Sequence, residues 1–271
     1  MSDQVELGNY VLVRRMAVSG MSEVHLASAG AGPMAGRQVV VKILLDDVAG
    51  IQQFRTLFEN EARLASVLTH PNIVKFVDCG ESDGRPFLVM EHVDGLDLQR
   101  LLRRSKRSGE GIPPAQGVYI VLKVLEALEY LHSLSDETGN PMNIIHRDIS
   151  PSNILLGVDS EVKLGDFGIA YSEQAGLESF GRKFKGKVHY LSPEQVRGEP
   201  VDLRSDLYST GVVLAELMIG RKPFDLQRFP LGGGRGFLLG GSLFMIRLFV
   251  QVNLQVAFDA GLELVSGLLE L

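Results

Sequence analysis

Two polar motifs constrain this chain more than any other feature: HRDISPSN at 146–153 and GDFG at 165–168. Strand-like runs, ILL and VKLG, stand between them, so we expect a hairpin whose ends bring Asp148 and Asp166 together. Carboxylate and amide oxygens suit Mg²⁺, which is commonly held by one or two carboxylates plus substrate phosphates. We therefore expect Asp166 and Asn153 to bind Mg²⁺, leaving Asp148 to accept a proton from an attacking hydroxyl.

Short strand patterns come first in the chain and long helical patterns come later. Val-rich runs over 10–45 indicate strands, and residues 51–69 carry a helical apolar spacing. After Gly95 long helical patterns follow, one of them starting near Pro113 and Pro114. This order predicts an α+β fold of two lobes, a small β-rich one and a larger, mainly helical one.

The lobes can be given expected boundaries. We expect the N-terminal lobe over residues 10–93 and the core of the C-terminal lobe over 94–225. Residues 226–271 form an apolar, Gly-rich tail with an atypical composition.

Composition excludes several classes of protein. The hydrophobic fraction of 45% is enough to build a packed core. A net charge of -6 argues against general nucleic-acid binding. Cys79 is the single cysteine, and MSDQVELGNY lacks the features of a secretory signal. These observations favour a cytoplasmic protein.

H-R-D-x-x-x-x-N followed by D-F-G resembles the signature of the eukaryotic-type protein kinase family. SPSN and YLSPEQ are similar to the bacterial Hanks-type serine/threonine kinases. Further matches occur in order over about residues 10–225: VVVKIL, FENEARL, HPNIV, MEHVDGLDL, GKVHYLSPE and DLRSDLYSTGVVLAEL. The resemblance implies a bilobal kinase fold that transfers the ATP γ-phosphoryl group to protein Ser or Thr hydroxyls with Mg²⁺.

The resemblance also assigns roles to residues. Lys42 matches the lysine that contacts the α- and β-phosphates, and Glu61 matches its helix partner. Asp148 matches the catalytic base, and Asp206 matches a buried anchor of the catalytic loop. His146 is expected to be a packed, hydrogen-bonded core residue rather than a base.

The nucleotide pocket follows from the same alignment. Met90 would be the gatekeeper, the backbone of Glu91 and Val93 would bond the adenine edge, and Asp97 would sit by the ribose. The residues expected around ATP are Met16, Ala17, Val18, Ser19, Gly20, Met21, Ser22, Val24, Val40, Lys42, Met90, Glu91, Val93, Asp97 and Leu155.

The phosphate loop departs from the family. Its three marked glycine positions hold Ala17, Ser19 and Ser22, and only Gly20 remains, at a position that the motif leaves free. Ala and Ser are the smallest replacements, so backbone N–H groups could still cradle phosphates. We expect weaker ATP binding rather than none. Val40 also replaces the usual Ala and could tighten the adenine slot.

A second departure concerns the catalytic centre. The family usually has Lys where this chain has Ser150, and Thr where it has Lys187. We hypothesise that the cation has changed sides, so that Lys187 supplies the charge near the γ-phosphate and Ser150 the hydroxyl. The alternative is that Lys187 points to solvent.

Two further segments invite predictions. A phosphate on Ser179 in the activation segment could pair with Arg147 and the nearby basic residues Arg182, Lys183 and Lys185. A basic run, Arg103, Arg104, Lys106 and Arg107, is expected to be a solvated helix end, with docking of acidic substrate segments as the alternative.

The tail and the activity leave alternatives open. Residues 226–271 could form divergent helices, an altered or truncated end of the lobe, or a segment that contacts a membrane or a partner. The expected partners are ATP and a protein substrate; membrane contact is not favoured. The rival functions are a pseudokinase scaffold without turnover and a small-molecule phosphotransferase, although YLSPE argues against the latter.

Overall fold

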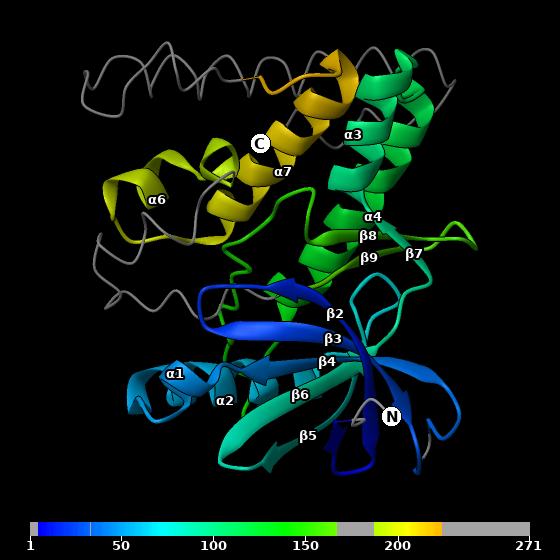
Figure 1. The fold of residues 1–271 in the computed structure, drawn as a ribbon. Helices are drawn as coiled ribbons and strands as arrows, with labels where there is room; N and C mark the ends of the chain where they lie inside the picture. The colour runs from blue at the N-terminus through cyan, green and yellow to red at the C-terminus, as the bar shows by residue number, and fades with distance from the viewer. Residues whose placement is uncertain (1–4, 33, 167–186, 224–271) are drawn as a thin grey trace.

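The computed structural model describes residues 5–32, 34–166 and 187–223. Figure 1 shows a β-sheet in the lower part of the view, helices in the upper part, and three short strands between them. The α+β, two-lobed architecture that the sequence predicts is therefore confirmed.

The lower sheet has six antiparallel strands in the order β1-β2-β3-β4-β6-β5. Its strands are β1 (Glu6–Leu7), β2 (Tyr10–Val18), β3 (Ser22–Ala29), β4 (Gln38–Leu44), β5 (Phe76–Ser82) and β6 (Arg85–Glu91). Side chains alternate between the two faces of a strand, so Val39, Val41 and Ile43 enter one apolar cluster. Lys42 and Leu44 lie on the opposite face.

Helix α2 (Gln52–Val67) covers that opposite face. Its Leu57 and Phe58 pack in one buried cluster with Leu44 of β4 and Leu88 of β6. The same cluster includes Met21, at the end of the β2–β3 hairpin. A short helix, α1 (Asp46–Ala49), precedes α2 and was not predicted. This packing fixes α2, and with it Glu61, beside Lys42.

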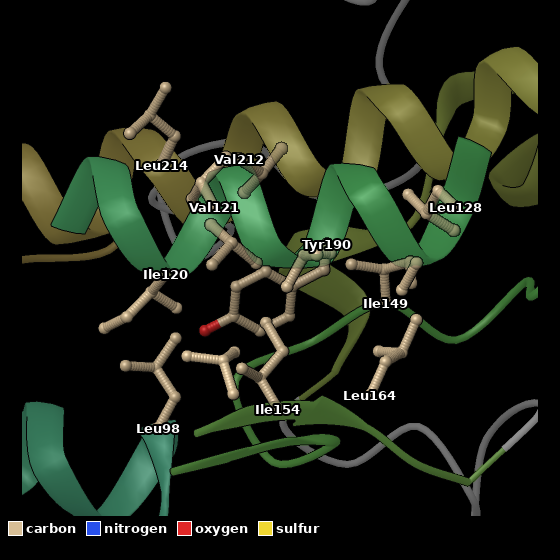
Figure 2. Packing of buried hydrophobic residues seen from close by; sticks show 14 of the residues in the cluster. Leu98, Ile120, Val121, Leu128, Ile149, Ile154, Leu164, Tyr190, Val212 and Leu214 are labelled. Atoms are coloured by element: carbon tan, nitrogen blue, oxygen red, sulfur yellow. The ribbon is translucent and has the colours of Figure 1, made fainter. Parts of the chain in front are cut away.

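The upper lobe is built on two long helices. Its helical elements are α3 (Leu98–Ser108), α4 (Pro114–Ser133), the 3₁₀ turn η2 (Val188–Tyr190), α6 (Pro193–Arg197) and α7 (Leu203–Ile219). Figure 2 shows the Tyr190 ring among buried aliphatic residues, including Val121 of α4 and Ile154. The Tyr190 hydroxyl donates a hydrogen bond to Glu216 Oε2 at 2.5 Å, which satisfies the polar end of this buried ring.

Three short strands, β7 (Gly95–Asp97), β8 (Ile154–Gly157) and β9 (Val162–Leu164), form a second sheet in the order β7-β8-β9. The β8–β9 hairpin is the one expected between the two polar motifs. Strand β7 was not predicted; Gly95 pairs with Gly157 in its register with β8. The sheet therefore joins the segment after β6 to the hairpin that carries both motifs.

A side chain at Gly95 should break this junction. A Cβ atom there would lie 1.9 Å from the Leu156 carbonyl oxygen and 2.9 Å from Gly157 Cα. These are backbone atoms that cannot turn aside, so Gly95→Ala should lower the free energy of unfolding by about 1–3 kcal/mol. Gly50→Ala is the matched control, because Gly50 has φ −79° and a Cβ atom added there would meet no other residue's atom within 4 Å, its two chain neighbours aside. Urea denaturation of both variants tests this; equal stability would contradict it.

Several sequence predictions lie outside the described residues. They are the phosphorylation of Ser179 with the basic residues Arg182, Lys183 and Lys185, and every alternative for the tail 226–271. In the part of the chain that the structure describes, no helix has both the length and the apolar character needed to cross a bilayer.

Candidate active site

Asp206 of α7 holds the loop that contains Asp148. Its side chain is buried, and its two carboxylate oxygens accept hydrogen bonds from the backbone N–H groups of His146 and Arg147, both at 2.8 Å. Arg147 has φ 65°, a left-handed conformation that is unfavourable for a residue with a Cβ. The expectation that Asp206 anchors the catalytic loop is confirmed. The contact of His132 Nε2 with Asp206 Oδ2, at 2.9 Å, was not predicted.

His146 connects the two polar motifs. It is fully buried, and its Nε2 lies 3.2 Å from the Gly165 carbonyl oxygen. Its Nδ1 accepts a hydrogen bond from the Asp148 backbone N–H at 3.3 Å. Burial lowers the pKa of this imidazole, so His146 is neutral at pH 7. The structure confirms His146 as a packed core residue that joins the Asp148 backbone to Gly165, next to Asp166.

Lys42 of β4 forms ion pairs with two carboxylates of the site. Its Nζ lies 2.5 Å from Glu61 Oε1 and 3.4 Å from Asp166 Oδ1. Burial alone would lower the Lys42 pKa, but the two carboxylates raise it, so the side chain is charged. Conversely, the Lys42 ammonium lowers the pKa of Asp166. The predicted Lys42–Glu61 pair is confirmed.

Asp148, Asn153 and Lys187 meet at the loop that follows His146. Lys187 Nζ lies 2.6 Å from Asp148 Oδ2 and 3.2 Å from Asn153 Oδ1. The Asn153 amide group donates to the Asp148 backbone oxygen at 2.8 Å and to its Oδ2 at 2.9 Å. Lys187 therefore faces the catalytic loop, and the alternative that it points to solvent is wrong for this conformation.

Ser150 does not join that group. Its side chain is buried, and its hydroxyl lies 3.0 Å from Ser152 Oγ. Lys187, the cation that we expect to replace the usual lysine, therefore lies at Asp148. The Ser150 hydroxyl, by contrast, lies against Ser152.

The phosphate loop is closed by the two serines that replace glycines. Ser19 N–H donates to the Ser22 carbonyl oxygen at 2.7 Å, and Ser22 N–H donates to Ser19 Oγ at 3.2 Å. The two hydroxyl oxygens lie 2.8 Å apart. Two backbone N–H groups of the loop are therefore already used within the hairpin. Sequence reasoning missed this pairing, although two serines three positions apart in a turn were the available signal.

The expected adenine slot lies beside Lys42. Val24 pairs with Lys42 across β3 and β4, and Val40 pairs with Met90 across β4 and β6. Because alternate residues share a face, these side chains line the same face of the sheet. Five of the residues expected around ATP are partly exposed: Met16, Val24, Val40, Met90 and Leu155. Their contact with adenine stays a prediction. So do the backbone roles of Glu91 and Val93.

Asp97 has a structural role that the sequence analysis missed. It is the N-cap of α3, where Oδ1 accepts from Arg100 N–H at 2.8 Å and Oδ2 lies 3.1 Å from Arg100 Nε. An Asp directly before a helical run is a signal for such a cap. Its contact with ribose stays a prediction.

Glu194 of α6 is joined to α7 by a side-chain hydrogen bond. The Ser205 hydroxyl of α7 donates a hydrogen bond to Glu194 Oε1. The sequence analysis missed this contact, because a serine near the start of a helix carried no distinguishing signal.

Comparison with known proteins agrees with this geometry. A family model for the protein kinase domain matches residues 28–229. The tyrosine-protein kinase MasK of Myxococcus xanthus is 38% identical over 81% of this chain and 34% of its own length. The serine/threonine-protein kinases PrkC of Bacillus subtilis and PknB of Mycobacterium leprae are 37% and 38% identical. The match to PrkC spans 80% of this chain and 31% of PrkC. The match to PknB spans 83% of this chain and 34% of PknB.

A solved structure gives the same result for the fold. The kinase domain of PknI from Mycobacterium tuberculosis is 30% identical, with a TM-score of 0.62, over 83% of this chain and 80% of that one. This chain spans about a third of the length of the curated relatives named above. Since the family model spans most of the sequence and includes Lys42, Glu61, Asp148 and Asp166, the chain belongs to the protein kinase domain family.

Proposed function

We propose that this chain transfers the γ-phosphoryl group of ATP to Ser or Thr hydroxyls of protein substrates. The observation that carries the proposal is the position of Lys42 Nζ, which contacts both Glu61 and Asp166. In protein kinases the Lys–Glu ion pair and the metal-binding Asp must both be in place for phosphoryl transfer. Here a single ammonium joins the two groups.

Different residues bind the phosphate groups and the metal ion. Lys42, fixed by Glu61, binds the phosphate groups of ATP. Asp166 fits a magnesium site, because half of its side-chain surface is exposed and its oxygens suit that ion. Mg²⁺, when bound, neutralises charge on the phosphate oxygens. Asn153, the other ligand that the sequence predicts, already accepts a hydrogen bond from Lys187.

Asp148 acts on the acceptor. Its carboxylate orients the substrate hydroxyl and takes its proton as the oxygen bonds to the γ-phosphorus. The bond from that phosphorus to the bridging oxygen breaks, and ADP leaves. Positioning and charge stabilisation supply most of the rate in such a reaction. The buried Asp206 supports this geometry by fixing the backbone next to Asp148.

Lys187 is the cation that we place near the transferred group. Some cation must stay close to the phosphoryl oxygens while their charge develops. Position 150 holds a buried serine instead of the usual lysine. The Lys187 ammonium, 2.6 Å from Asp148, is in a position to replace it.

Removal of this charge should slow the reaction. Lys187→Met should lower kcat at least about tenfold, because an oriented charge at the developing oxyanion is lost. Lys187→Arg, which keeps a cation, should retain more of the activity. Steady-state rates at saturating ATP measure both. An unchanged kcat in Lys187→Met would contradict the role.

The acceptor class needs a direct test, because MasK is named a tyrosine kinase and PrkC and PknB are named serine/threonine kinases. The chain is incubated with labelled ATP, Mg²⁺ and a generic protein substrate, and the labelled amino acids are identified after acid hydrolysis. Phosphoserine or phosphothreonine is expected. Phosphotyrosine alone would overturn the acceptor class.

The specific observation that favours a second function, a pseudokinase scaffold, is the closed phosphate loop. The Ser19 and Ser22 N–H groups are used within the hairpin rather than being free for phosphate. Nucleotide binding without any transfer of label in the same experiment would select this alternative.

A further inference from the structure

The side-chain oxygen of Asn153 is already occupied by protein groups. Asn153 is buried, and its Oδ1 accepts hydrogen bonds from Lys187 Nζ at 3.2 Å and from Ser152 Oγ at 3.3 Å. The amide nitrogen of the same side chain donates twice to Asp148. An oxygen that faces an ammonium group is a poor ligand for a second cation.

Asp166 differs from Asn153 in each of these respects. Half of its side-chain surface is exposed, and Oδ1 lies 3.4 Å from Lys42 Nζ. Within the described residues Oδ2 has no hydrogen-bond partner. Asp166 also has φ 53°, an unfavourable conformation for a residue with a Cβ. This carboxylate therefore fits a metal ion, whereas Asn153 in the present arrangement does not.

The Lys187 charge also opposes a metal ion beside it. The ammonium lies 2.6 Å from Asp148 Oδ2 and 3.2 Å from Asn153 Oδ1, so it already balances the charge of this carboxylate. A divalent cation on Asn153 would stand next to a fixed positive charge, and such repulsion is strong at short distance in a partly buried site. Metal binding at Asn153 would first require Lys187 to leave.

We infer that the Lys187 ammonium takes the place of one metal ion, so that this chain works with a single Mg²⁺, held by Asp166. Protein kinases in general hold two Mg²⁺, through the Asp of D-F-G and the Asn of the catalytic loop. The inference rests on the proposed function, since it concerns the metal that accompanies ATP. It makes Lys187 a positioning residue as well as a charge, because it orients the Asn153 and Asp148 side chains.

The number of metal ions can be counted without turnover. Mn²⁺ replaces Mg²⁺, and a non-hydrolysable ATP analogue is kept below the protein concentration so that it is all bound. Electron paramagnetic resonance of free Mn²⁺ then gives the ions held per bound nucleotide. We expect one ion for the native chain and for Lys187→Arg, and two for Lys187→Thr, in which the charge is removed.

Each possible ion count either supports or overturns the inference. Two ions on the native chain at sub-millimolar Mn²⁺ would overturn the inference, as would one ion on both the native chain and Lys187→Thr. If Lys187→Thr fails to fold, as judged by its melting curve, the native count still decides, and Lys187→Met supplies the second comparison. Calorimetry with the same analogue measures nucleotide binding separately from the number of metal ions. An absence of nucleotide binding would sink the proposed function, whereas two ions with active transfer would sink only the inference about Lys187.

Discussion

Asp148→Asn should lower kcat about 10²- to 10⁴-fold, the range that a positioned general base contributes. An amide cannot take the proton of the acceptor hydroxyl, although it has the shape of the carboxylate. The variant also loses the ion pair with Lys187 at 2.6 Å, while the Lys187 contact with Asn153 remains. Nucleotide binding should persist, because the contacts of Lys42 with Glu61 and Asp166 do not involve Asp148.

The measurement is the steady-state transfer of label from ATP to a protein substrate, together with the affinity for ATP. Asp159→Asn is the matched control, since it makes the same chemical change at an exposed position in the β8–β9 turn. It should behave as the native chain does. If Asp148→Asn kept more than a tenth of the native kcat, Asp148 would not be the base and the proposed mechanism would fail.

The parts of the site that the sequence predicts are those fixed by local spacing. Asp148 and Asn153 share one loop, and the β8–β9 hairpin ends at Leu164, two residues before Asp166. For these residues, chain geometry and chemistry restrict the outcome before any tertiary packing is considered. Lys42 and Glu61 were paired by their match to a known motif, and the packing of α2 on the sheet brings them together.

The contacts that the sequence did not predict depend on tertiary packing. Ser205 reaches Glu194 because α7 packs beside α6, and no spacing rule relates the two residues. Gly95 is required by the position of the Leu156 carbonyl, which only the paired strands reveal. The Ser150 contact is different, because its partner Ser152 is only two residues away and no motif indicated it.

The electrostatic core of the small lobe allows a prediction that separates stability from catalysis. Lys42→Met should lower kcat about 10²- to 10³-fold, since an oriented charge at the phosphates is lost. It should also destabilise the fold by about 3–5 kcal/mol, because the buried Glu61 loses the ammonium that balances it. Glu61→Gln should cost less in both respects, since Lys42 still contacts Asp166 at 3.4 Å.

The double variant Lys42→Met with Glu61→Gln is the decisive comparison. Removal of both charges leaves no uncompensated buried ion, so stability should return toward the native value. Activity should stay at the level of Lys42→Met, because no group replaces the ammonium at the phosphates. Urea denaturation and label transfer measure the two quantities on the same samples. If the double variant were no more stable than Lys42→Met, the lost charge balance would not explain the destabilisation. If Lys42→Met kept near-native kcat, the Lys42 ammonium would not act on the phosphates, and the geometry that carries the proposed function would have another purpose.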